Sequence, residues 1–146
     1  MKEHYSFMIE NSESYKVHIV ILKWNNNKIL KRCLESIENF DHKNFTISVI
    51  DNNSSDDSLK MISENFPNVQ MIKNSKNFKF GRGYNEGLKK INVEDNDFII
   101  LLNDDTIVSR NFIDELINPL AKDQKAIIST PKTVSYTHLT LPTTTL

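Results

Sequence analysis

The 146-residue chain has few of the residues that cross-link or interrupt small folds: one cysteine, three glycines and four prolines. A single cysteine, Cys33, excludes an internal disulfide and is typical of a reducing compartment. No apolar run approaches the roughly 20 residues that a membrane-spanning helix needs. The start, MKEHYSFMIENSESY, lacks the continuous apolar stretch of a signal peptide. We therefore expect a cytoplasmic protein, which in a longer parent would lie in the cytoplasm or at the inner face of the membrane.

The chain also lacks an excess of charge of either sign. Its formal net charge is −1 with 25% charged residues, so no general attraction to nucleic acid or to anionic membranes is expected. Hydrophobic residues make up 38% and are concentrated in short runs, which indicates folding rather than disorder. The length fits one domain with a real core. We assign residues 1–16 to a loose N-terminal lead-in and residues 17–132 to the domain.

Short β-branched runs alternate with helical patterns along this domain. VHIVIL (17–22) is typical of a strand buried on both faces, and FIILL (98–102) predicts a second buried strand. Crossovers between parallel strands need about a dozen residues, so this alternation predicts an α/β fold with a mainly parallel sheet flanked by helices. The expected strands are 17–22, 45–50, 69–73, 97–102 and 126–130; the expected helices are 25–40, 54–66, 84–91 and 109–120.

Three polar clusters, KWNNN, DNNSSDD and NDDT, follow the ends of predicted strands. Ligands of parallel α/β sheets bind beyond these ends, so the clusters should converge. Asp104 and Asp105 in NDDT have no basic residue within three positions on either side. Such carboxylates suit Mg²⁺ or Mn²⁺, which take one or two of them together with substrate phosphates. A turn followed by a helix cap is the alternative.

The second cluster offers both binding and capping groups. Asp51 and Asn52, directly after a predicted strand, provide an acceptor and a donor for the polar edge of a nucleobase. Ser54, Ser55 and Asp56 are expected to cap the next helix, as the asparagines of KWNNN are expected to cap theirs.

All three glycines lie in NFKFGRGYNEGL, which we interpret as a loop opening a helix at Tyr84. Such a loop lets backbone approach a phosphate or sugar closely, and Arg82 would then face a diphosphate or solvent. Neither the GxGxxG nor the GxxxxGK[ST] nucleotide fingerprint is present.

The last segment differs in character from the rest. VSYTHLTLPT within residues 133–146 resembles the translation of an adapter used in transposase-based sequencing libraries. We interpret 133–146 as a non-native tail and exclude it from fold and function reasoning. We accordingly expect the domain to be truncated and the natural protein to be longer.

Taken together, the ordered segments VHIVILKWNNNKILKRCLESI, ISVIDNNSSDDSL, NFKFGRGYNEGL, FIILLNDDTIVSRNFIDELI and AIISTPK resemble the inverting family 2 glycosyltransferases of the GT-A fold, in particular a rhamnosyltransferase-like branch. The resemblance runs from Val17 to Lys132. It implies the donor-binding half of an enzyme that transfers a sugar from a nucleoside-diphosphate sugar, UDP- or dTDP-linked, to a hydroxyl of a glycan or lipid-linked acceptor. Such enzymes serve cell-wall or polysaccharide biosynthesis.

The resemblance also implies roles for single residues, by position. Trp24 stands where an aromatic residue stacks on the base, and an indole face can do so. Asp105 matches the ligand of a divalent metal, Mg²⁺ or Mn²⁺, and Asp104 the residue that faces the ribose. The remaining donor-binding positions are Asp51 and Asn52 at the base edge and Gly83 and Asn85 at the loop and helix start beside the donor.

The sequence departs from the family pattern at two places. Lys79 stands where a glycine is usual before phenylalanine, and Asn103 takes the first position of a strict DxD motif. No residue is assigned as the general base, because the family supplies it from a downstream region; neither His18 nor Asp114 is a supported candidate. We expect this chain alone to lack transferase turnover.

Other classes fit the sequence less well. A phospho-acceptor receiver domain needs acids after its first strand, where this chain has KWNNN. A haloacid-dehalogenase-type phosphatase needs Asp-x-Asp-x-Thr at that same place. A nucleotide-binding α/β module without chemistry stays open as the alternative.

Overall fold

The computed structural model describes residues 15–95, 97–122 and 125–131. Within them lies a four-stranded parallel sheet in the order β3-β2-β1-β4, so the predicted α/β fold with a parallel sheet is confirmed. Residues 1–14 of the predicted lead-in and the whole predicted tail lie outside the described ranges. The strands are β1 (Val17–Lys23), β2 (Phe45–Asp51), β3 (Gln70–Lys73) and β4 (Phe98–Asn103); the helices are α2 (Asn27–Ile37), α3 (Ser58–Asn65), α4 (Phe80–Leu88) and α5 (Phe112–Lys122).

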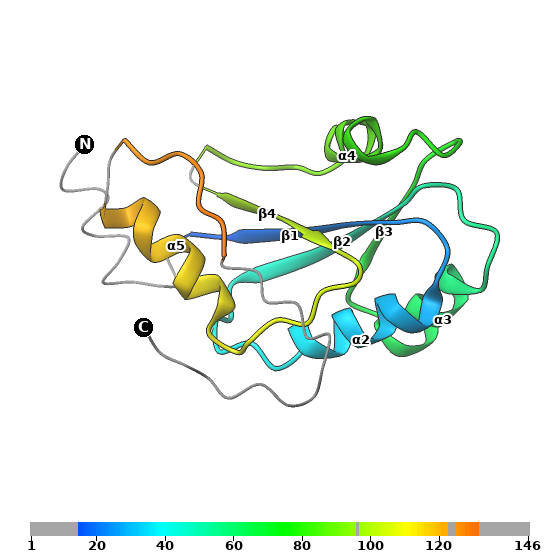
Figure 1. Cartoon of the computed structure of the whole chain (residues 1–146), viewed down its shortest axis with the longest axis horizontal. Coiled ribbons are helices and arrows are strands. Elements are labelled where there is room, and N and C mark those ends of the chain that lie inside the picture. The colour runs from blue at the N-terminus through cyan, green and yellow to red at the C-terminus, as the bar shows by residue number, and fades with distance from the viewer. Residues whose placement is uncertain (1–14, 96, 123–124, 132–146) are drawn as a thin grey trace, which may run out of the picture.

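Helices cover both faces of the sheet. Figure 1 shows α2, α3 and α5 on one side and α4 alone on the other. The larger core lies on the first side, where buried residues of α2 and α5 such as Leu34 and Ile113 pack against Ile19 and Ile21 of β1. The smaller core joins Val20, Ile50, Ile72 and Tyr84 beneath α4. No helix in the described part of the chain is long and apolar enough to cross a bilayer.

The register of the sheet brings the predicted polar clusters to one edge. Lys23 at the end of β1 pairs with Asp51 at the end of β2, and Leu22 pairs with Asn103 at the end of β4. Because the strands are parallel, the segments that follow them leave from the same side. The expected convergence of the three clusters is therefore observed.

Helix α4 docks on the sheet through glycines and one tyrosine. A Cβ on Gly87 would lie closer than 3.0 Å to three side-chain carbons of Ile50, so only glycine lets the helix approach β2 this closely. The Tyr84 hydroxyl donates to the Leu102 carbonyl at 2.9 Å and accepts from the Leu22 N–H at 3.3 Å. Burial raises the pKa of Tyr84 to about 12, which keeps this hydroxyl a donor.

The predicted start of this helix, Tyr84, is wrong, because α4 begins at Phe80. Gly81 and Gly83 consequently lie inside the helix rather than in the loop before it, whereas Gly87 lies in the helix as expected. Glycine has low helix propensity, but at Gly83 and Gly87 the close packing against the sheet outweighs it.

Two strand expectations are also corrected. Strand β4 is not buried on both faces: Ile100 and Leu102 are buried, whereas Ile99 and Leu101 are 45% and 54% exposed. This happens because β4 is at the edge of the described sheet and α4 does not extend over it. Residues 126–130 form no strand; Ile127 is 87% exposed, since strand propensity needs a neighbouring strand to pair with.

Substituting Gly87 by alanine tests the close approach of α4. The added methyl must displace the buried Ile50 side chain, so we expect the free energy of unfolding to fall by about 1–3 kcal/mol. Gly81→Ala is the matched control, because a Cβ there meets nothing within 4 Å and alanine favours helix. Urea denaturation measures both; equal stability of the two variants would contradict the packing argument.

Candidate active site

The ends of β1, β2 and β4 surround a pocket of about 580 Å³, which we call the strand-end pocket. Its size lies within the range of small-molecule sites in proteins. It is lined by residues 22–24 at the end of β1, Asn52 after β2, Asn77, Lys79 and Phe80 at the approach to α4, and residues 103–105 at the end of β4. Of the residues predicted from the sequence, the structure brings Trp24, Asn52, Asp104 and Asp105 together here.

Beneath the pocket lies a buried lysine that the sequence analysis missed. The side chain of Lys23 is fully buried, and its ammonium lies 3.3 Å from a carboxylate oxygen of Asp56 and 3.8 Å from one of Asp51. A buried charge of this kind is stable only when it is paired. A lysine ending an apolar strand, with acids ending the neighbouring strand, was the available signal.

Asp51, predicted to contact a nucleobase, is 0% exposed. Its carboxylate accepts from the Ser54 N–H at 3.2 and 3.3 Å in addition to facing Lys23. Its backbone continues the sheet, because the Asn74 N–H donates to the Asp51 carbonyl at 2.9 Å. Asp51 thus lies under the pocket rather than on its surface.

Asp56 caps two helices. It accepts from the Ser58 N–H at 3.2 Å, which confirms its predicted role at the start of α3, and from the Asn27 N–H at 3.1 Å at the start of α2. The expected asparagine cap of α2 is wrong: Asn26 has φ 64° and makes no side-chain capping bond. Burial raises the pKa of Asp56, but the hydrogen bonds from Ser58 and the charge of Lys23 outweigh it and leave the pKa lowered.

Asn52 is the centre of an amide network in the wall of the pocket. Its Nδ2 donates to Asn77 Oδ1 and to the Lys79 carbonyl, both at 3.0 Å. Its Oδ1 accepts from Asn74 Nδ2 and from the Phe78 N–H, both at 3.1 Å. This side chain therefore holds the segment before α4 against the end of β2.

Two aromatic rings lie at the rim. Trp24 is 56% exposed and Phe80 is 64% exposed, although exposed rings of this size are costly in water. Both line the strand-end pocket. Each offers an uncovered face to a flat ligand such as a nucleobase.

The acidic pair lies on the opposite wall. Asp104 is half-buried and Asp105 is exposed. Burial, followed by the charge of Asp105, raises the pKa of Asp104, and the charge of Lys23 opposes this only in part. Two adjacent carboxylates with incomplete compensation fit a divalent cation. No group of three or more His, Cys, Asp or Glu side chains in the described part of the chain could hold one alone, so ligand phosphates or water would complete the shell.

Two predicted donor-binding residues do not line this pocket. Gly83 is buried on the side of α4 that faces the sheet, where an added Cβ would lie 3.0 Å from Asn52 Nδ2 and 3.1 Å from Leu22 carbons. Asn85 is exposed on α4. His18 is also remote from the pocket: it lies at the opposite end of β1, where its ring contacts Asp97 at 2.8 Å.

Lys79 has a backbone conformation that side chains rarely adopt. Its φ is 65° and its ψ −165°, a region that is nearly exclusive to glycine. Asn77 Oδ1 accepts from its N–H at 2.8 Å, and its carbonyl accepts from Asn52. The family that the sequence resembles usually has glycine at this position. Lysine in place of glycine therefore has a structural cost here.

Comparison with known proteins agrees with this geometry. A sequence model described as "Glycosyl transferase family 2" matches residues 18–142, and the chain therefore belongs to that glycosyltransferase family. The match includes part of the predicted tail, whose adapter origin stays a prediction. Comparison with curated protein sequences gave no match.

Solved structures of glycosyltransferases share the fold. S. aureus TarS 1–349 aligns with a TM-score of 0.63 and 19% identity over 73% of this chain and 32% of TarS 1–349. The complex of TarS 1–349 with UDP-GlcNAc aligns with a TM-score of 0.63 and 20% identity over 73% of this chain and 31% of the TarS chain. A third structure is the mannosyltransferase PcManGT from Pyrobaculum calidifontis in complex with GDP-Man and Mn²⁺. It aligns with a TM-score of 0.65 and 13% identity over 82% of this chain and 39% of PcManGT. The predicted GT-A-like fold is confirmed, and the chain spans about a third of these structures.

Replacing Lys79 by glycine tests the backbone strain. Relief of the strained conformation exceeds the added chain entropy of glycine, so we expect the free energy of unfolding to rise by about 1 kcal/mol. Lys76→Gly is the control, since Lys76 is an exposed lysine of the same segment with ordinary φ, and there we expect a loss. A destabilised Lys79→Gly variant in chemical denaturation would reject the strain argument.

Proposed function

We propose that this chain is the donor-binding part of a metal-dependent, inverting glycosyltransferase of the rhamnosyltransferase-like branch. The whole protein would transfer a sugar from a nucleoside-diphosphate sugar to a hydroxyl of a glycan or lipid-linked acceptor, for cell-wall or polysaccharide biosynthesis in the cytoplasm or at the inner membrane face. The observation that carries the proposal is the strand-end pocket, where an exposed indole, an amide network and an acidic pair meet.

The acidic pair would hold the cation. Asp105, the more exposed of the two, is the proposed ligand of Mg²⁺ or Mn²⁺, and Asp104 would accept from a ribose hydroxyl. When bound, the ion supplies positive charge that offsets the charge developing on a leaving diphosphate. PcManGT, whose structure contains GDP-Man and Mn²⁺, is a neighbour that supports this assignment.

The other wall would hold the base. Trp24 offers a face for stacking, and Asn52 shapes the polar side of the cavity. Asp51 would contact the edge of the base only after one of its carboxylate oxygens leaves Ser54 or Lys23. In the structure described here, its role would be to hold the wall of the pocket in place. We propose a uridine or deoxythymidine diphosphate donor; the TarS complex with UDP-GlcNAc supports the uridine choice.

Gly83 and Asn85 contribute indirectly in this proposal. Gly83 allows α4 to approach Asn52 and Leu22, which places Phe80 at the rim. Asn85, exposed on α4, keeps only its sequence-based assignment. No described residue is assigned as the general base that would deprotonate the acceptor hydroxyl.

Asp105→Asn tests the metal role. The amide removes one negative charge from an exposed position, so we expect Mn²⁺-dependent affinity for UDP to fall at least about tenfold while the unfolding midpoint changes little. Asp95→Asn, an exposed acid in the loop before β4, is the matched control. Calorimetry would measure both, and unchanged Mn²⁺-dependent affinity of Asp105→Asn would rule out this ligand.

Trp24 provides a direct readout of base stacking. It is the only tryptophan of the chain and is 56% exposed, so the tryptophan emission reports the surroundings of this side chain alone. We expect saturating UDP with Mn²⁺ to quench its fluorescence, and Trp24→Leu to weaken UDP affinity by about tenfold, within the range for loss of base–aromatic stacking. Emission unchanged at a UDP concentration shown by calorimetry to saturate would contradict stacking.

A further inference from the structure

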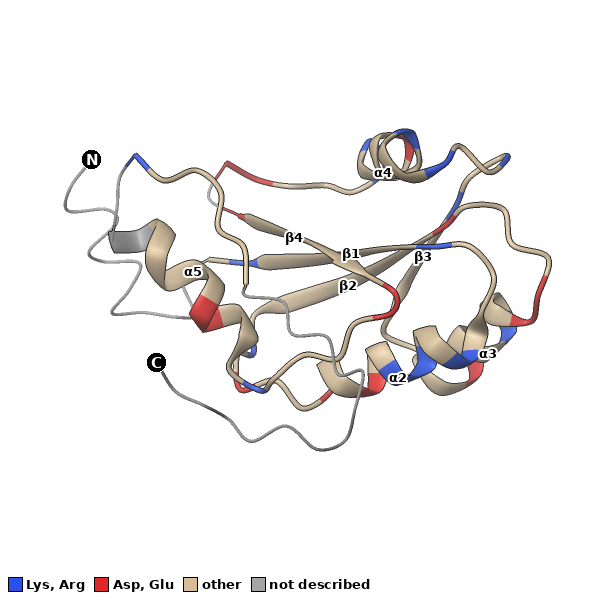
Figure 2. Cartoon of the chain, in the orientation of Figure 1, with Lys and Arg blue, Asp and Glu red and all other residues tan. Residues whose placement is uncertain are grey.

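The positive charge of the chain is unevenly distributed. Residues 73–90 contain six of its 18 Lys and Arg residues but only one of its 19 Asp and Glu residues, a formal charge of +5. The remaining 12 basic and 18 acidic residues give −6, so the near-neutral total conceals a basic segment. Figure 2 shows Lys and Arg positions of this segment in blue on α4 and on the loop that precedes it. A local field of this sign favours an anionic ligand.

The basic segment encloses a second cavity, which we call the β3–α4 pocket. Its volume is about 450 Å³, and it lies between the end of β3 and the outer side of α4. It shares no lining residue with the strand-end pocket. Its lining includes Lys73, Asn74, Ser75, Phe78, Glu86 and Lys90.

A buried side chain in its wall has an unsatisfied acceptor. Asn74 is 2% exposed, and its Nδ2 donates to Asn52 Oδ1 at 3.1 Å and to the Gly83 carbonyl at 3.2 Å. Both partners are acceptors, which fixes the orientation of the amide. Its Oδ1 has no hydrogen-bond partner. A buried acceptor left alone is costly, and because this oxygen has almost no exposed surface, a ligand can bond to it only after the wall of the pocket shifts.

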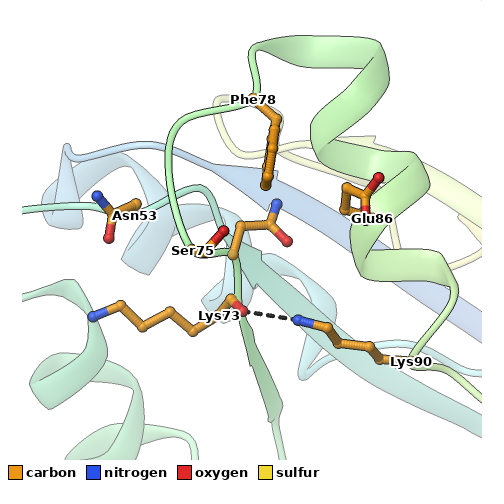
Figure 3. A pocket seen from close by; sticks show the side chains of 7 residues that line it. Asn53, Lys73, Ser75, Phe78, Glu86 and Lys90 are labelled. Carbon is orange, nitrogen blue, oxygen red and sulfur yellow. Dashed lines mark hydrogen bonds between the residues drawn. The ribbon is translucent and has the colours of Figure 1, made fainter.

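The charged groups of the pocket are separated in space. Figure 3 shows the Lys73 ammonium on one side and the Glu86 carboxylate on the other, with Phe78 above Ser75. Lys90 lies between, where its ammonium donates to the Lys73 carbonyl at 2.9 Å. The pocket thus combines cations, hydroxyl-binding acceptors and one aromatic ring.

We propose that the β3–α4 pocket binds an anionic saccharide, a sugar that carries a carboxylate or a phosphate. The ammonium groups of Lys73 and Lys90 would pair with the anionic group. Glu86, which also pairs with Lys89 at 3.1 Å, would accept from a ring hydroxyl, as would Asn74 Oδ1 once a shift of the pocket wall exposes it. Phe78 would contact the C–H face of the ring. An inorganic anion would leave the acceptors unsatisfied, and a neutral sugar would leave the ammonium groups unpaired.

This site is adjacent to the proposed donor site but chemically distinct from it. Asn74 and Asn52 form the wall between the two pockets through a single amide hydrogen bond. Substitutions on the Lys73 side should therefore leave the nucleotide site intact. Failure of the saccharide proposal and failure of the glycosyltransferase proposal can consequently be told apart.

The test is a titration of the ¹⁵N-labelled chain, followed by NMR, with glucuronate, glucose 6-phosphate, glucose and inorganic phosphate. We expect glucuronate, glucose 6-phosphate or both to shift the Asn74 side-chain and Ser75 amide signals with millimolar Kd, and the pattern identifies the anionic group. Glucose and inorganic phosphate should bind at least about fivefold more weakly.

Lys73→Gln removes the charge and leaves a polar side chain that is one atom shorter. It should weaken binding of the anionic sugar by about fivefold, the upper range for an exposed ion pair. Lys60→Gln, an exposed lysine on α3, is the matched control and should change nothing. The UDP affinity measured through Trp24 should stay the same in both variants.

Three results would overturn the proposal. They are equal binding of glucose and glucuronate, binding of inorganic phosphate as tight as that of glucose 6-phosphate, and anionic-sugar binding that Lys73→Gln leaves unchanged. Absence of shifts at Asn74 and Ser75 with every probe would also overturn it.

Discussion

The ammonium of Lys23 is the group on which the site depends. It ends β1 inside the protein, and it pairs with the carboxylate of Asp51 at the end of β2 and with that of Asp56 in the segment after β2. Asp56 in turn caps both α2 and α3, so one buried cation connects two strands and two helix starts. Because an unpaired charge could not be buried here, the loop after β2 has to fold back over β1. That fold-back gives the strand-end pocket its floor.

The strand-end pocket and the β3–α4 pocket are connected by amides rather than by charges. The Asn52 side chain forms hydrogen bonds with Asn77, in the segment before α4, on one side and with Asn74 on the other. Such a network is rigid only when all of its members are satisfied, and the Asn74 oxygen is the member that is not. Occupation of the second pocket would therefore also tighten the wall that the first pocket shares.

Much of the sheet was predictable, because β-branched runs and helical spacing report burial directly. The convergence of Trp24, Asn52 and the acidic pair followed from the parallel topology alone. The start of α4 was not predictable from propensity, since Gly83 and Gly87 are explained by Leu22 and Ile50, which are distant in sequence. Lys23 was missed because its burial depends on acids that lie 28 and 33 positions further along the chain. Residues 126–130 show the converse: strand-forming residues do not make a strand without a neighbour.

The scarcity of glycine has a consequence for the rim of the strand-end pocket. No glycine has a positive φ; the left-handed positions at Asn25, Asn26 and Asn53 are occupied by asparagine, with φ between 58° and 64°. Asparagine tolerates this conformation but has fewer alternatives than glycine when the chain unfolds. The turns around the opening of the pocket therefore lose less conformational entropy on folding. A ligand would bind to an opening that is already preorganised, so that little of its binding energy would be spent on ordering the protein.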